Sequence, residues 1–441
     1  MKIKFALAFL SLLLVSSIHA LASTTSERLS HMAISENPAE AGPAISELRS
    51  MGPAGFTSLL LVHGEEIQRH IANPLEPATP EWLRLSAALD TVSQQRDSYL
   101  SRLYWYTDLS QAEAAAKSSG KPILSLRLLG NLNEEFSCAN SRFFRTVIYS
   151  NADVSKALRE RFILHWQSVR PAPRVTIDFG DGRKLERTLT GNSIHYVLDP
   201  EGRVIDALPG LYGPDAFLSS LSRAEDVGRR LAGLTGDARQ QWLADYHQAA
   251  VKSITAAWLE DARRAGGRIP ESLLPKSNGK GTRAVDIAPL AVTKGITEFS
   301  ILQAITRDAD SLKAVTDEAT WTRIAWRHIA DARLDEQSIG LVRRQMESLW
   351  AQDQTGPKPE VKIVSLLQKF QQSIALDTVR NEYMLHTKVH AWLASGLVRD
   401  DVETFNEKVY AELFLTPKSD PWLGLFSDDT YVGLQNGGVV P

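Results

Sequence analysis

The sequence predicts an α/β domain with a mixed sheet, placed between two helical regions. Between residues 105 and 224, segments with helical spacing alternate with short apolar segments typical of buried strands. On both sides of this range the apolar residues recur at helical spacing instead. The chain has 441 residues, which is too many for one hydrophobic core, so we expect more than one domain.

Residues 1–22 have the pattern of a secretory signal peptide. A short basic start precedes the apolar run FALAFLSLLLVSSI (5–18), and small residues follow at 20–22. No later run reaches the roughly 18 apolar residues that a membrane helix needs. We therefore expect an exported protein, periplasmic or extracellular, that has no membrane attachment after cleavage.

A helical N-terminal region is predicted for residues 23–104. Its polar start, residues 24–43, is expected to be irregular. A clear helix start follows at Thr79-Pro80, where threonine caps the helix and proline occupies its first turn. Apolar residues at helical spacing after Trp82 indicate that this helix packs against its neighbours.

The central domain, residues 105–224, begins with a helix. Ser110 and Glu113 are expected to form its capping box, and Gly120 ends it. Strands and hairpins follow, and the domain closes with a helix that starts at Gly213-Pro214. The predicted strand segments are 123–129, 162–166, the hairpin 174–189, and the hairpin formed by 193–198 and 203–208.

The C-terminal domain, residues 225–441, is predicted to be helical. Its tryptophans lie at helical spacing and are most simply explained as core residues. The whole chain has a net charge of −3 and 23% charged residues, so it lacks the basic surface that nucleic-acid binding requires. With a single cysteine, Cys138, no intramolecular disulfide can form.

Residues 105–224 resemble the thioredoxin fold, as found in exported proteins of that family. The segment AEAAAKSSGKP (112–122) stands where the family has an alanine- and lysine-rich lead, and CANSRFF (138–144) stands where its Cys-x-x-Cys motif opens a helix. The segments 150–166 and 195–206 match the stretches that follow. The resemblance implies a thioredoxin-like three-layer sandwich with a degenerate CxxS site.

The resemblance implies thiol chemistry at Cys138. The unpaired N–H groups and the dipole at a helix N-terminus stabilise a thiolate. A cysteine placed there can therefore have its pKa lowered from about 8.5 to roughly 3.5–7.5. Ser141, one turn on, is placed to donate a hydrogen bond to that thiolate, but it cannot resolve a mixed disulfide. Ser137 replaces the family's aromatic residue before the cysteine, and Ser193 replaces its cis-proline.

Two functions follow. In one, the protein is a monothiol thiol–disulfide oxidoreductase or isomerase that acts through Cys138, supported by Ser141 and Ser193, on protein or small-molecule thiols. In the other, it is a redox-inactive thioredoxin-fold scaffold whose helical regions recognise a partner. Neither function requires a cofactor.

Further candidate residues are histidines. Glu382, His386 and His390 are spaced four apart on a predicted helix and share one face, where they either bind a divalent ion or form a partly buried polar surface. No other metal-ligand pattern accompanies them, so we expect no metal. His165 and His195 lie in predicted strands, where we expect packed side chains rather than a Cys–His pair.

Overall fold

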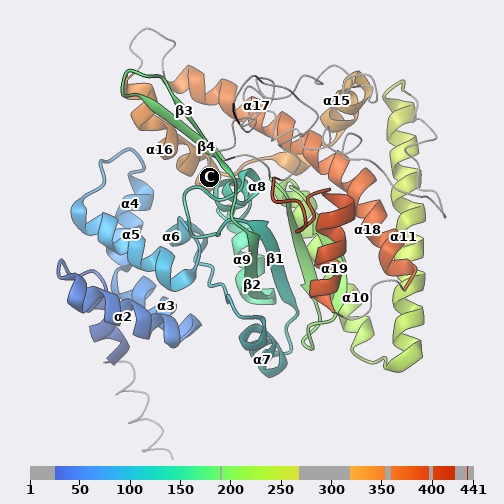
Figure 1. Ribbon diagram of the computed structural model, residues 1–441, viewed down its shortest axis with the longest axis horizontal. Helices are drawn as coiled ribbons and strands as arrows, with labels where there is room; N and C mark the ends of the chain where they lie inside the picture. Colours follow the sequence, from blue (N-terminus) through green and yellow to red (C-terminus); the bar gives the residue numbers. More distant parts are fainter. Residues whose placement is uncertain are drawn as a thin grey trace, which may run out of the picture.

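A computed structural model describes residues 25–188, 191–267, 318–352, 359–396, 401–422 and 435 (Figure 1). Over these residues the protein is mixed α/β, with many helices around a small mixed sheet. The predicted signal peptide, residues 1–22, lies outside the described residues. Among the described residues, no helix combines the length and the apolar composition required to cross a membrane.

The N-terminal region is helical and has a core of its own, built around Leu48, Leu59, Leu85 and Leu89. The prediction that residues 24–43 are irregular is wrong in part. Residues 25–32 form a helix, and this helix buries Leu29 against the N-terminal core. Thr79 caps α5 as predicted, since its side chain accepts a hydrogen bond from the Trp82 N–H. The helices are α2 (Pro38–Ser50), α3 (Pro53–Val62), α4 (Gly64–Ala72), α5 (Pro80–Ser93) and α6 (Ser98–Ser101).

The main sheet of the central domain contains four strands in the order β2-β1-β5-β6. β1 runs parallel to β2, and the other two pairings are antiparallel. All residues of β1, β5 and β6 are buried, which explains their apolar sequences. The bounds are β1 (Ile123–Leu129), β2 (Ile163–Arg170), β5 (Ser193–Leu198) and β6 (Val204–Pro209).

Four helical segments accompany this sheet: α7 (Leu109–Ser119), α8 (Ala139–Phe143) with its π-helical continuation η1 (Phe144–Ile148), α9 (Ala152–Arg161) and α10 (Pro214–Leu231). The predicted capping box of α7 is wrong. The cap is Asp108, whose carboxylate accepts hydrogen bonds from the Ser110 and Gln111 N–H groups. Aspartate is as good a cap as serine, and here it lies at the residue where the backbone becomes helical.

The predicted hairpin at 174–189 forms a separate two-stranded sheet, β3 (Arg174–Asp178) and β4 (Lys184–Thr188), outside the main one. It extends away from the four-stranded sheet (Figure 1). Most of its side chains are at least partly exposed, which fits its alternation of polar and apolar residues.

The C-terminal region shares a hydrophobic core with the central domain, and this core runs from Leu103 to Leu413. The long helix α11 lies beside α18, on the side of the molecule away from α2–α5 (Figure 1). The elements are α11 (Gly236–Arg264), α15 (Glu318–Arg327), η5 (Ile329–Ala332), α16 (Glu336–Gln352), α17 (Pro359–Arg380), η6 (Asn381–His386), α18 (Thr387–Ala394), α19 (Val402–Lys408) and η7 (Val409–Leu413).

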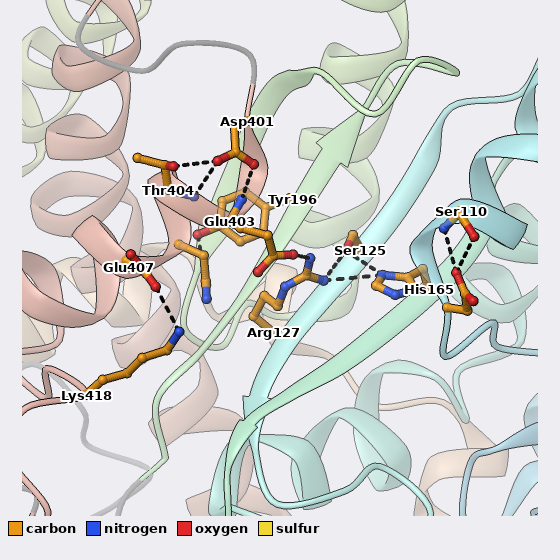
Figure 2. A network of polar contacts seen from close by, with 12 residues as sticks. Ser110, Ser125, Arg127, His165, Tyr196, Asp401, Glu403, Thr404, Glu407 and Lys418 are labelled. Carbon is orange, nitrogen blue, oxygen red and sulfur yellow. Dashed lines mark hydrogen bonds and ion pairs between the residues drawn. The ribbon is translucent and has the colours of Figure 1, made fainter.

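A buried arginine connects the sheet to α19. Arg127 extends from β1 and is 1% exposed, and its guanidinium forms an ion pair with Glu403, which is half-exposed (Figure 2). The same guanidinium donates to Ser125 Oγ at 2.6 Å. The Tyr196 hydroxyl of β5 donates to Asn406 at 3.2 Å. The predicted strand 123–129 therefore carries its charged residue toward the C-terminal helices.

Candidate functional site

Cys138 is the N-cap residue of α8, as the sequence indicated. Its backbone N–H donates to the Leu129 carbonyl at 3.1 Å, which ties the start of the helix to the end of β1. α8 has only five residues before the chain continues as the π-helical segment η1. The cysteine therefore lies beside the end of the first sheet strand, at the start of a short helix.

The thiol of Cys138 is fully buried. Burial raises the pKa of Cys138, and the opposing hydrogen bonds from Ser141 and Leu129 do not overcome this effect. The direction is opposite to the lowered pKa that a helix N-terminus alone predicts. Desolvation of the thiolate in the apolar core is thus the stronger influence on this sulfur.

Ser141 and Ser193, the other two predicted site residues, are both buried near Cys138 but bond differently from the expectation. The Ser141 hydroxyl donates to the Cys138 carbonyl at 3.1 Å, closing a turn of the helix. Ser193 Oγ accepts from the Asn140 side-chain amide at 2.9 Å. The backbone at Ser193 pairs with Leu128 across the sheet, so β1, β5 and α8 meet at this point.

The C-terminal region covers this site. Tyr410 of η7 donates to the Asn192 carbonyl at 3.1 Å, one residue before Ser193. The Asn192 amide donates to Thr416 Oγ1 at 3.1 Å. The buried Tyr410 hydroxyl lies near enough to Cys138 for a charged thiolate to raise the pKa of that tyrosine further. The C-terminal region therefore packs against the start of β5, close to Cys138.

His165 and His195 are packed side chains, as expected. The Tyr149 hydroxyl and His195 Nε2 are hydrogen-bonded at 2.6 Å, and Ser125 Oγ and His165 Nδ1 at 2.8 Å (Figure 2 for the latter). Burial lowers the pKa of each histidine to about 3. Both imidazoles are therefore neutral at physiological pH, and their partners are Tyr149 and Ser125 rather than Cys138.

A second cluster of titratable side chains lies on the opposite edge of the sheet from β2. The Oδ1 atom of Asp206, a residue of β6, lies 3.1 Å from His386 Nε2 and 3.8 Å from His390 Nδ1. His386 Nδ1 is 2.8 Å from Glu382. His247 of α11 completes the cluster, with its Nδ1 2.7 Å from His390 Nδ1.

Electrostatic interactions divide this cluster into a charged part and a neutral part. Burial opposes a charge on Asp206, yet the imidazoles of His390 and His386 hold its pKa below the usual range. Burial likewise opposes protonation of His386, but Glu382 and Asp206 outweigh it and raise the pKa to about 10. Burial lowers the pKa of His390 to about 3 and that of His247 to about 4.

The predicted trio Glu382, His386 and His390 thus shares a face, but the sequence did not reveal Asp206 and His247. Asp206 carries a recognisable signal, because it is an acid inside the otherwise apolar strand VIDALP. His247 lies in a long helix with no such signal.

A cavity of about 620 Å³ opens beside the cluster. It lies between α10, α11, α17 and η6, and His390 and Glu382 form part of its wall. Arg223, which is half-exposed, stands 3.8 Å from Glu382. Three tyrosines, Tyr212, Tyr246 and Tyr383, also line it, so the cavity combines apolar area with a few polar groups, as ligand sites do.

Comparisons with protein-family models, with curated proteins and with solved structures give no match to this chain.

Proposed function

We propose that the protein is an exported, redox-inactive thioredoxin-like scaffold that binds a ligand between its central domain and its C-terminal helices. The strand order supports the thioredoxin-like part of this proposal. Two parallel strands are followed by two antiparallel ones, and the helix that Cys138 caps is the next element after the first strand. This order agrees with the resemblance of residues 105–224.

The burial of Cys138 is the observation that carries the redox-inactive part. A thiol–disulfide exchange needs a thiolate that reaches the sulfur of another molecule. Here the sulfur has no exposed area, and burial raises its pKa. Both properties oppose attack on an external disulfide.

The cavity supports the binding role. It is large enough for a small molecule and is walled by helices that the central domain alone does not supply. A scaffold explains why the C-terminal region shares a core with the central domain, because the two together form the wall around Tyr212, Tyr246 and His390.

The monothiol oxidoreductase is the second candidate function. The helix N-cap position of Cys138 and its hydrogen bonds with Ser141 favour it, because both stabilise a thiolate. In that function Cys138 attacks one sulfur of a disulfide, the other sulfur leaves as a thiolate, and a partner thiol releases the product. The buried sulfur must become accessible in each cycle.

Trapping of mixed disulfides tests the two functions against each other. The purified chain is incubated with oxidised glutathione, and the fraction of protein carrying one glutathione is measured by mass spectrometry. The scaffold predicts no adduct in the folded protein and a complete adduct after unfolding in urea. Rapid glutathione uptake by the folded chain, absent in Cys138→Ser, contradicts the scaffold and supports the monothiol enzyme.

A further inference from the structure

Three side chains from distant parts of the sequence meet behind the cavity wall. Asp206 comes from β6, His247 from α11 and His390 from α18. One ligand-type atom of each lies within 4.8 Å of those of the other two, and all three residues are buried. The residues that surround Cys138 are separate from this cluster.

We propose that Asp206, His247 and His390 bind a divalent first-row transition-metal ion. Imidazole nitrogen suits zinc, iron, nickel and copper, whereas magnesium and calcium prefer oxygen ligands alone. Two histidines and one carboxylate leave coordination positions open for water or a substrate. The inference rests on the proposed function, since it names what the binding site holds.

The distances within the trio are compatible with one central ion. Ligand atoms that are about 2.0–2.1 Å from a metal stand roughly 3–3.5 Å apart. His390 Nδ1 lies 2.7 Å from His247 Nδ1, which is shorter than this spacing. It lies 3.8 Å from Asp206 Oδ1, which is longer. Small side-chain rotations bring both into range, and each neutral imidazole then binds the ion through Nδ1 and carries its proton on Nε2.

The surroundings of Asp206 are those of a supported ligand. His386 Nε2 lies 3.1 Å from its Oδ1, and His386 Nδ1 in turn lies 2.8 Å from Glu382. Hydrogen-bonded neighbours of this kind fix the orientation of a metal ligand and tune its affinity. His386 is therefore a positioning residue that acts through Asp206.

The cavity supplies an entry path. His390 forms part of its wall, whereas Asp206 and His247 are close to His390 but do not line the cavity. An ion that arrives through the cavity of about 620 Å³ meets His390 first, since His390 is the ligand that lines it. A ligand of the ion has room there beside Tyr246 and Arg223.

Metal titration of the full chain tests the proposal. The protein is purified without a histidine tag, treated with a chelator, and titrated with Zn²⁺ by calorimetry and with Co²⁺ by visible absorption. We expect one ion per chain. His390→Gln and His247→Gln should lower the affinity at least 100-fold, and His386→Gln by about 10–100-fold, as for other supporting residues. His165→Gln, a buried histidine of the central domain, is the matched control and should bind as the unchanged protein does.

Two results overturn the proposal. One is the absence of any one-to-one uptake of Zn²⁺ or Co²⁺ by the unchanged protein, which decides the question even if the variants do not fold. The other is uptake that His390→Gln and His165→Gln affect equally. Neither result depends on Cys138. Absence of metal binding would not contradict the redox-inactive scaffold, and a reactive Cys138 would not contradict the metal site.

Discussion

The hydroxyl of Tyr410 donates a hydrogen bond to the carbonyl of Asn192 at 3.1 Å, joining η7 to the residue that precedes Ser193. The two residues are 218 positions apart, and both are buried. This bond holds the C-terminal region next to the start of β5, where Cys138 and α8 also lie. It therefore connects the burial of the thiol to the packing of the C-terminal helices.

Tyr410→Phe should expose Cys138 more often without changing the fold. The change leaves the buried Asn192 carbonyl without this donor, which costs about 1–3 kcal/mol of the free energy of unfolding. We expect faster alkylation of Cys138, measured alongside urea denaturation. Tyr196→Phe is the control, because it removes a bond from the sheet to Asn406 of α19 rather than to η7. Equal acceleration in both variants contradicts a local role for Tyr410.

Glu403→Ala should destabilise the attachment of α19 to the sheet. It removes the ion-pair partner of Arg127 (Figure 2). The Arg127 side chain is 1% exposed, and that of Glu403 is 49% exposed. Because the guanidinium retains its bond to Ser125, we expect a loss of about 1–3 kcal/mol in the free energy of unfolding by urea denaturation.

Glu403→Gln is the matched control for that change. It keeps an acceptor oxygen for Arg127 and should lose less stability than Glu403→Ala. If the two variants are equally stable, and both match the unchanged protein, Arg127 does not depend on this partner.

His195→Gln should change how stability depends on pH. Burial lowers the pKa of His195 to about 3 in the folded protein, against about 6.5 when unfolded. The unfolded state therefore binds more protons between these values, and stability falls as the pH falls through this window. Removing His195 should reduce the slope of unfolding free energy against pH by about 1.4 kcal/mol per pH unit.

The measurement for His195 is urea denaturation of both proteins at several values between pH 4.5 and 6. The difference between the two slopes isolates His195 from other groups, including Asp90, whose pKa burial raises to about 7 and whose contribution has the opposite sign. Parallel curves for the two proteins contradict a neutral, buried His195.

Ser141→Cys restores a Cys-x-x-Cys spacing and should still give no oxidoreductase activity. Ser141 and Cys138 are both fully buried, so the added thiol does not give the first one access to a substrate. The assay is the reduction of a protein disulfide by the variant with dithiothreitol as the electron source. Activity well above that of dithiothreitol alone means that the missing second cysteine, and not burial, is what limits the site.

The secondary structure around the site was predictable because it depends on local signals. The strand 123–129 and the helix start at Gly213-Pro214 follow from an apolar run and from a proline in the first helical turn. The cap of α7 was misplaced by two residues, because Asp108 and Ser110 are both good caps and the sequence does not say where the backbone turns.

The environment of each site was not predictable, since it depends on contacts between distant segments. Cys138 is near Tyr410, and Asp206 is near His247 and His390, through packing that no spacing rule encodes. The helix N-terminus correctly places Cys138 but gives the wrong direction for its pKa, because the thiol is buried in the core that the central domain and the C-terminal region share. Only the face shared by Glu382, His386 and His390 was visible beforehand.

The rate of alkylation of Cys138 as a function of pH tests the central claim most directly. Because Cys138 is the one cysteine in the sequence, the signal needs no assignment, and the urea-unfolded chain provides the reference rate. A redox-inactive scaffold predicts a folded rate far below the unfolded one, with a thiol pKa above the usual value of about 8.5. A folded rate that equals or exceeds the unfolded one, with a pKa below that value, contradicts the account and makes Cys138 a working thiol.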